Sequence, residues 1–158
     1  MFGFGKKKKE ENFVSFGTGK LVALDKVPDQ VFSTKMMGDG FAIDITEGEI
    51  YAPVSGTATM VFKTGHAFGI TTDEGVEVLL HLGVDTVELD GKGFAGKVQQ
   101  GDSIIQGQLL TTMDLDTIRA AGKPTISMCI FTSGENVKLL KEDADVKALD
   151  EAIIELSK

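Results

Sequence analysis

Residues 62–85 read Phe62-Lys-Thr-Gly-His-Ala-Phe-Gly-Ile-Thr-Thr-Asp-Glu-Gly-Val-Glu-Val-Leu-Leu-His-Leu-Gly-Val-Asp85 and contain both histidines of the chain, His66 and His81. The middle of this stretch holds residues typical of turns: Asp73, Glu74 and Gly75. After the turn, apolar residues at 76, 78, 80 and 82 alternate with Glu77, Leu79 and His81, which is the period of a strand. The stretch therefore predicts two strands joined by a tight turn.

The length of the turn decides whether the two histidines face each other. A four-residue loop, Thr72 to Gly75, places His66 directly opposite His81, whereas a three-residue loop moves them one residue out of register. Directly opposed residues share a face, with Cβ atoms roughly 5 Å apart. The four-residue loop predicts a histidine pair flanked by Phe68 and Leu79, and the alternative is two unrelated histidines on one sheet.

Composition limits the class of protein. The chain has 158 residues, 42% apolar and 25% charged, which predicts one domain with a sizeable core. A net charge of −8 argues against nucleic acid as the main partner, because phosphates require a basic surface. The single cysteine, Cys129, lies among apolar residues and predicts a buried, inert thiol in a reducing compartment. No apolar run is long enough to span a membrane and no signal peptide is recognisable, so we expect a cytoplasmic protein.

Residues 1–14 are predicted to form a flexible tail, and residues 15–158 a single folded domain. The tail is rich in glycine and charge and lacks periodicity. Phe2, Phe4 and Lys6–Lys9 allow at most weak contact of residues 1–9 with an anionic membrane, and a simply solvated tail is the alternative.

The remainder of the chain consists of short apolar segments separated by turns. Nineteen glycines and many short strands favour an all-β sandwich or barrel. Two short helices are expected, one after Pro28-Asp29 and one over 114–122, where aspartates precede the helix and Gly122 ends it. Residues 145–157 fit either a strand or a helix, because their apolar residues also recur at helical spacing.

The histidine stretch lacks the companions that several enzyme classes require. A hydrolytic zinc site usually has three protein ligands, and the chain has two histidines and no His-Glu-x-x-His motif. Neither a Gly-x-Ser-x-Gly elbow nor a phosphate-binding glycine loop is present. Two histidines on an exposed apolar surface do suffice for a phosphoryl carrier, in which one accepts the group and the other binds its oxygens.

Four motifs resemble the glucose-type enzyme IIA (EIIA) family of the bacterial phosphoenolpyruvate-dependent sugar phosphotransferase system. They are Gly65-His-Ala-Phe-Gly-Ile70, Leu80-His-Leu-Gly-Val-Asp-Thr-Val-Glu-Leu89, the segment 27–40 and Ala52-Pro-Val-Ser-Gly56. The resemblance covers roughly residue 21 to the end. It implies an antiparallel β-sandwich with Greek-key and jelly-roll features and short helices, in agreement with the all-β prediction.

The resemblance also implies roles for individual residues. His81 would accept the phosphoryl group at Nε2, with its Nδ1–H bound by a carbonyl near Gly83, and His66, oriented by Thr64, would stabilise the phosphate. Asp85 would lie at the rim of a surface that binds partners. The apolar residues of that surface would be Val31, Phe32, Met36, Met37, Phe62, Leu79 and Val87, to which the four-residue hairpin register adds Phe68.

The implied partners are the phosphocarrier HPr as donor and the EIIB domain of a sugar permease as acceptor, with regulatory proteins as further candidates. The implied chemistry needs no cofactor beyond a transient phosphohistidine and no intrinsic metal, and the chain is expected to be a monomer. A biotinyl or lipoyl carrier module is the alternative, prompted by Ala52-Pro-Val-Ser-Gly56 and residues 101–109, but a suitable lysine at a hairpin tip is missing.

Overall fold

The structure is a computed structural model that describes residues 12–158. Residues 1–11, and with them most of the predicted tail, lie outside the described residues. Phe13 and Val14 are buried, and Phe13 packs edge-on against Phe131 of the core with ring centroids 4.9 Å apart. The folded domain therefore begins before residue 15, because these two apolar side chains gain more from burial than from a place in a solvated tail.

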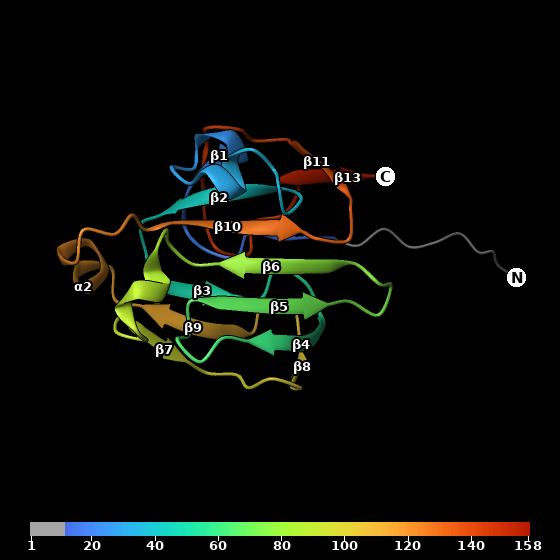
Figure 1. The fold of residues 1–158 in the computed structure, drawn as a ribbon. Coiled ribbons are helices and arrows are strands. Elements are labelled where there is room, and N and C mark those ends of the chain that lie inside the picture. Colours follow the sequence, from blue (N-terminus) through green and yellow to red (C-terminus); the bar gives the residue numbers. More distant parts are fainter. Residues whose placement is uncertain (1–11) are drawn as a thin grey trace, which may run out of the picture.

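Within residues 12–158 the strands form three antiparallel sheets (Figure 1). The large sheet has the order β12 (Asp145–Val146), β1 (Gly19–Ala23), β2 (Asp39–Ile45), β10 (Ile126–Phe131), β6 (Glu77–His81), β5 (Ala67–Thr71), β4 (Gly56–Val61) and β8 (Ser103–Ile104). The second sheet is β3 (Glu49–Tyr51), β9 (Leu109–Met113) and β7 (Phe94–Gly96), and the third pairs β11 (Asn136–Leu139) with β13 (Ile154–Ser157). The helices are η1 (Leu24–Lys26), α1 (Gln30–Ser33), η2 (Thr86–Leu89) and α2 (Leu115–Ala120).

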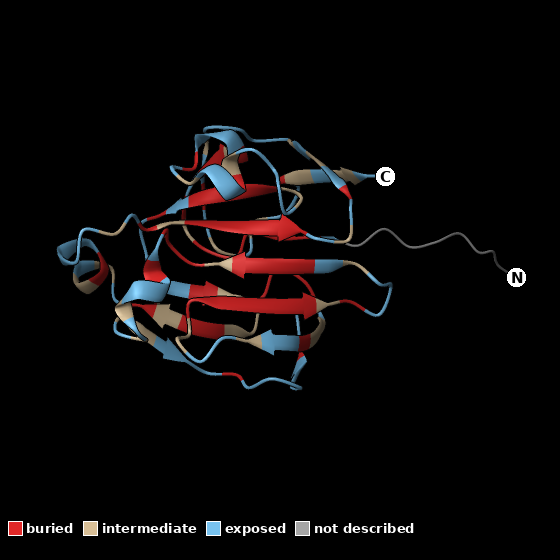
Figure 2. Ribbon diagram, in the orientation of Figure 1, coloured by how far each residue is buried: buried red, intermediate tan, exposed pale blue. Residues whose placement is uncertain are grey.

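The main core lies between the large sheet and the second sheet. Phe41, Phe68 and Leu80 from the large sheet pack in one cluster with Ile50 and Leu110 from the second. Figure 2 shows the resulting burial of the central strands and the exposure of the connecting loops. Strand β10 pairs with both β2 and β6, from which it is far in sequence, as in a Greek key. The antiparallel all-β prediction is confirmed; the sheets are open, so the arrangement is a sandwich rather than a closed barrel.

Of the two loop lengths considered above, the hairpin of β5 and β6 has the three-residue one. Ala67, not His66, pairs with His81, and the Thr72 amide donates to the Val76 carbonyl at 2.9 Å. The Thr72 hydroxyl also accepts from the Val76 amide, and Gly75 supplies the left-handed residue (φ +90°) that this turn requires. As a result Phe68 pairs with Leu80 and points into the main core with it.

A smaller apolar cluster covers the opposite face of the large sheet, the face that carries His81. Segment 24–32, which contains η1 and α1, packs Leu24, Val27 and Phe32 against Leu79 and Ile130 of the sheet. Helix α1 is positioned by Asp29, whose carboxylate accepts from the amide of Val31 at 2.9 Å and more weakly from that of Phe32. Phe32 is thereby held beside the end of β6.

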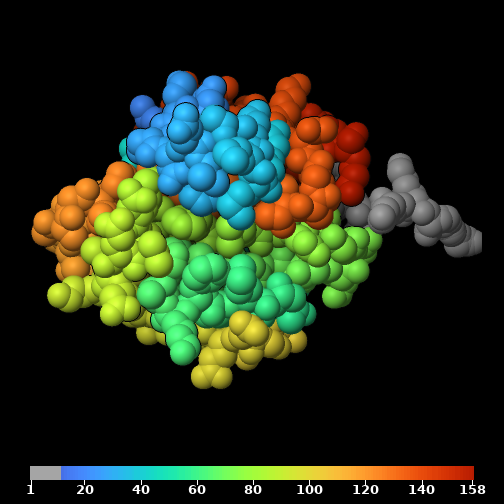
Figure 3. All heavy atoms as spheres, viewed as in Figure 1, coloured from blue at the N-terminus to red at the C-terminus, as the bar shows by residue number. Residues whose placement is uncertain are grey.

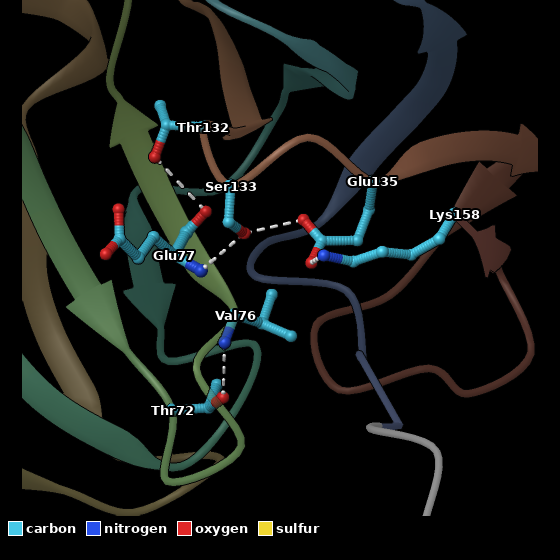
Figure 4. A network of polar contacts seen from close by, with 7 residues as sticks. All are labelled: Thr72, Val76, Glu77, Thr132, Ser133, Glu135 and Lys158. Atoms are coloured by element: carbon cyan, nitrogen blue, oxygen red, sulfur yellow. Dashed lines mark hydrogen bonds and ion pairs between the residues drawn. The ribbon is translucent and has the colours of Figure 1, made fainter.

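Residues 145–157 contain strands β12 and β13 and no helix. Leu149 and Ala152 both have positive φ, which interrupts the helical option that the apolar spacing left open. A polar network ties this end of the chain to the start of β6 (Figure 4). Ser133 accepts from the Glu77 amide at 2.9 Å and donates to the buried carboxylate of Glu135 at 2.6 Å, and Lys158 lies 3.6 Å from the same carboxylate.

The network lies beside a groove of about 610 Å³ lined by residues of the hairpin turn, Phe13 and β13. Neither histidine lines this groove. In the part of the chain that the structure describes, the helices are all too short to cross a membrane.

Candidate functional site

His81 is the last residue of β6, and its ring has a defined tautomer. Its Nδ1 lies 2.9 Å from the carbonyl oxygen of Gly83. Because a carbonyl can only accept, Nδ1 must carry the proton, and the lone pair is left on Nε2. Gly83 has φ +76°, and a Cβ there would lie 2.5 Å from the Thr86 methyl and 2.9 Å from the Pro124 carbonyl oxygen. This backbone position therefore accepts glycine alone without a shift of its neighbours.

His66 reaches the same place from the other strand. His66 precedes β5 and follows Gly65, which has φ +73°. The direction of the His66 side chain therefore does not follow the alternation of the side chains along β5. The His66 carbonyl accepts from the Leu82 amide at 2.7 Å, and the two imidazole rings meet edge to face with centroids 5.1 Å apart. The pairing that the four-residue loop predicted is thus present, although the register that predicted it is wrong.

Each histidine has a polar and an aromatic neighbour. The Thr64 hydroxyl is hydrogen-bonded to His66 Nδ1, and Phe62 packs edge-on against the His66 ring at 5.2 Å. Phe32 of α1 packs against the His81 ring with centroids 4.8 Å apart. These contacts fix both rings in a largely apolar setting.

Burial keeps both imidazoles neutral at pH 7. It lowers the pKa of His66 to about 4, with a smaller contribution from His81. Burial also lowers the pKa of His81, against the opposing effects of the Gly83 carbonyl, Asp29 and Asp85. A neutral imidazole with a free Nε2 lone pair is the nucleophilic form, so the site can attack an electrophile such as phosphorus at neutral pH.

The model of the phosphoenolpyruvate-dependent sugar phosphotransferase system EIIA 1 family matches residues 11–137, which include the whole histidine site. The chain belongs to this EIIA family. The biotinyl or lipoyl alternative finds no support in this match.

Two relatives illustrate the EIIA assignment. The chain is 50% identical over 131 residues to the glucose-specific EIICBA component of Streptococcus pneumoniae serotype 4 (strain ATCC BAA-334 / TIGR4). That match covers 83% of this chain and 18% of the relative, so the chain spans about a fifth of the streptococcal protein. The solved structure of glucose permease IIA from Mycoplasma capricolum is 38% identical, with a TM-score of 0.80 over 94% of this chain and 96% of the other. The sandwich fold is therefore that of a solved EIIA protein.

The predicted docking residues of this EIIA chain are not all at the surface. Five are exposed, and we call these five the apolar patch: Val31, Met36, Met37, Phe62 and Val87. Phe62 contacts the His66 ring, and Val31 precedes Phe32, which contacts the His81 ring. Asp85 is exposed beside them. Figure 3 shows the blue-to-cyan segment around α1 next to the green and yellow-green segments that contain Phe62 and Val87.

The other three predicted docking residues are buried. Phe32 and Leu79 are buried in the smaller apolar cluster, on the face of the sheet that carries His81. Phe68 is 1% exposed in the main core, so its predicted place on the docking surface is wrong. The reason is the hairpin register, which directs Phe68 to the face opposite His81.

Asp29 belongs to the site and was not predicted from the sequence. Its carboxylate caps α1 and raises the pKa of His81 relative to what burial alone would give. The local signal, Pro28-Asp29 before a short apolar run, identifies a helix start. Its proximity to His81 depends on how segment 24–32 folds over the sheet, and local sequence carries no record of that contact.

Proposed function

We propose that His81 is the phosphoryl acceptor of this EIIA protein, taking the group from phosphorylated HPr and passing it to the EIIB domain of a sugar permease. The observation that carries the proposal is the hydrogen bond from His81 Nδ1–H to the Gly83 carbonyl, which leaves the Nε2 lone pair free beside a second, buried histidine.

In the first step the Nε2 lone pair attacks phosphorus, and the bond from phosphorus to the donor breaks with its electron pair left on the donor. Positive charge develops on the His81 ring as the new bond forms. The Gly83 carbonyl, Asp29 and Asp85 stabilise that charge, since each favours the cationic ring. Transfer to a cysteine of EIIB reverses the step: the sulfur attacks phosphorus, and the Nε2 electron pair returns to the ring.

His66 acts on the phosphoryl oxygens. If the Thr64 hydroxyl donates to His66 Nδ1, the proton of the neutral ring lies on Nε2 and is available as a hydrogen-bond donor. The low pKa of His66 keeps its ring neutral. His66 therefore orients the phosphoryl group by a hydrogen bond and does not form an ion pair with it. Positioning of this kind supplies most of the rate in phosphoryl transfer.

The proposal extends to the binding partners, the oligomeric state and the cellular location of the protein. HPr and EIIB would use the same apolar patch in turn, and a phosphate on His81 would add negative charge there and change the binding of regulatory proteins. Glucose is the first sugar to test, because both relatives are named for it. We further propose a cytoplasmic monomer without intrinsic metal or cofactor. Sedimentation of the purified protein tests the oligomeric state, and elemental analysis tests the metal content.

The experiment is incubation with phosphoenolpyruvate, enzyme I and HPr, followed by intact mass measurement. We expect one added phosphate that is labile to acid and stable to alkali. His81→Gln should add none, with an unfolding transition close to that of the wild type. Normal labelling of His81→Gln would overturn the assignment of the acceptor.

A further inference from the structure

Three successive peptide units after His81 are each held by hydrogen bonds. In the first, the Leu82 amide donates to the His66 carbonyl at 2.7 Å. In the second, the Leu82 carbonyl accepts from the Thr86 hydroxyl at 2.5 Å and the Gly83 amide donates to the Ser127 hydroxyl at 3.1 Å. In the third, the Gly83 carbonyl accepts from His81 and the Val84 amide donates to the Pro124 carbonyl at 3.2 Å.

Much of this support comes from one distant segment, residues 123–127, which leads from α2 into β10. Ser127 binds the amide of the second peptide unit, the Pro124 carbonyl binds the amide of the third, and Lys123 reaches Glu88 of η2 at 2.5 Å. Ser127 is fully buried, and its hydroxyl both accepts from Gly83 and donates to the Thr125 carbonyl at 3.1 Å. Its hydroxyl group therefore links β10 to the turn after His81.

We propose that Ser127 is a positioning residue for phosphoryl transfer, which holds the Gly83 carbonyl in place and thereby sets the tautomer and orientation of His81. This inference rests on the proposed role of His81. It adds a residue whose side chain does not contact the imidazole and acts through the intervening peptide units.

The left-handed conformation of Gly83 explains why a hydroxyl is needed. The φ of Gly83 is fixed by the orientation of the peptide that joins Leu82 to Gly83, which Ser127 and Thr86 hold from its two ends. Without the Ser127 oxygen the buried Gly83 amide loses this acceptor and the peptide is free to turn toward another. If this peptide turns, the Gly83 carbonyl moves away from His81 Nδ1. The tautomer of His81 that carries its proton on Nε2 is then no longer disfavoured.

The test compares Ser127→Ala with Ser15→Ala in the full chain. Ser15 is also fully buried and donates to a nearby backbone carbonyl, that of Gly17 at 2.7 Å, but it lies outside β6, β10 and the loop after His81. The readouts are the ¹⁵N chemical shifts of the His81 ring in the unphosphorylated protein and the rate of phosphorylation by phosphorylated HPr.

For Ser127→Ala we expect a measurable population of the Nε2–H tautomer and a rate reduced about 10- to 100-fold, the range seen when a group that orients a metal-ligating histidine is removed. For Ser15→Ala we expect wild-type ring shifts and a wild-type rate. If Ser127→Ala does not fold, Thr86→Val tests the same peptide unit and should change the tautomer in the same direction.

Two results would overturn the inference: wild-type shifts and rate in Ser127→Ala, or equal changes in Ser15→Ala. The proposed function fails separately, if the wild-type protein takes up no phosphate at all while the tautomer still depends on Ser127.

Discussion

The rings of His66 and His81 meet at 5.1 Å, although His66 faces Leu82 across the hairpin and His81 faces Ala67. The contact is possible because His66 lies just before β5, after a glycine in the left-handed region. The site is therefore built from the end of β6 and the segment before β5, and its geometry depends on the residues that hold the backbone at Gly83 and Gly65.

His66→Gln should separate acceptance of the phosphoryl group from its onward transfer. His81 keeps its Gly83 hydrogen bond in this variant, so phosphorylation should still occur. Transfer to EIIB should fall by about 100-fold, the usual effect of removing one donor to a charge that develops in the transition state. Single-turnover transfer from the purified phosphoprotein measures this step, and an unchanged transfer rate would remove His66 from the mechanism.

Gly83→Ala should be more harmful than the same change at Gly75. Both glycines have positive φ, so each alanine carries a conformational penalty of about 1–2 kcal/mol. A Cβ at Gly75 meets no atom within 4 Å, whereas a Cβ at Gly83 meets Thr86 and Pro124 below 3 Å. We therefore expect a larger loss of unfolding free energy for Gly83→Ala, together with loss of phosphorylation.

Chemical denaturation and the labelling assay together check this pair. Gly75→Ala should label like the wild type. Equal stability of the two variants would show that the backbone around Gly83 yields more easily than its contacts indicate.

The buried neutral state of His66 should make stability fall in acid. The pKa of His66 is about 4 in the folded protein and near 6.5 when unfolded. Between these values the unfolded chain binds the proton and the folded chain does not, so the unfolding free energy decreases as pH falls from 6.5 toward 4. The full contribution is about 3 kcal/mol.

Denaturation of wild type and His66→Gln at pH 7 and pH 4.5 tests this linkage. The carboxylates are common to both proteins, so a difference in acid sensitivity reports His66. We expect the wild type to lose more stability between the two pH values than the variant does. Parallel pH profiles would contradict a depressed pKa.

How much of this could be read from sequence differs between residues. The alternation at 76–82 predicts the correct buried face of β6, because strand periodicity depends only on neighbouring residues. The helix start at Asp114 is also predicted correctly, because N-capping is a local interaction as well. Phe68 lies in the core and not on the docking surface because the loop is one residue shorter than the four-residue loop, and a shift of one residue moves every side chain of a strand to the other face. Asp29 and Ser127 were missed since each acts on His81 or Gly83 across a tertiary contact, which no spacing in the sequence encodes.

A charge placed on the apolar patch should weaken partner binding without affecting the fold. Met36 is 74% exposed beside α1, and Ile105, 70% exposed after β8, is a matched apolar residue outside the patch. Both Met36→Lys and Ile105→Lys should change the unfolding free energy by no more than about 0.5 kcal/mol, since neither side chain is packed. Met36→Lys should raise the KM for phosphorylated HPr several-fold, because docking through the apolar patch would bury the new charge at the interface. Ile105→Lys should leave that KM unchanged, and an equal effect of both substitutions would show that net charge rather than the apolar patch governs docking.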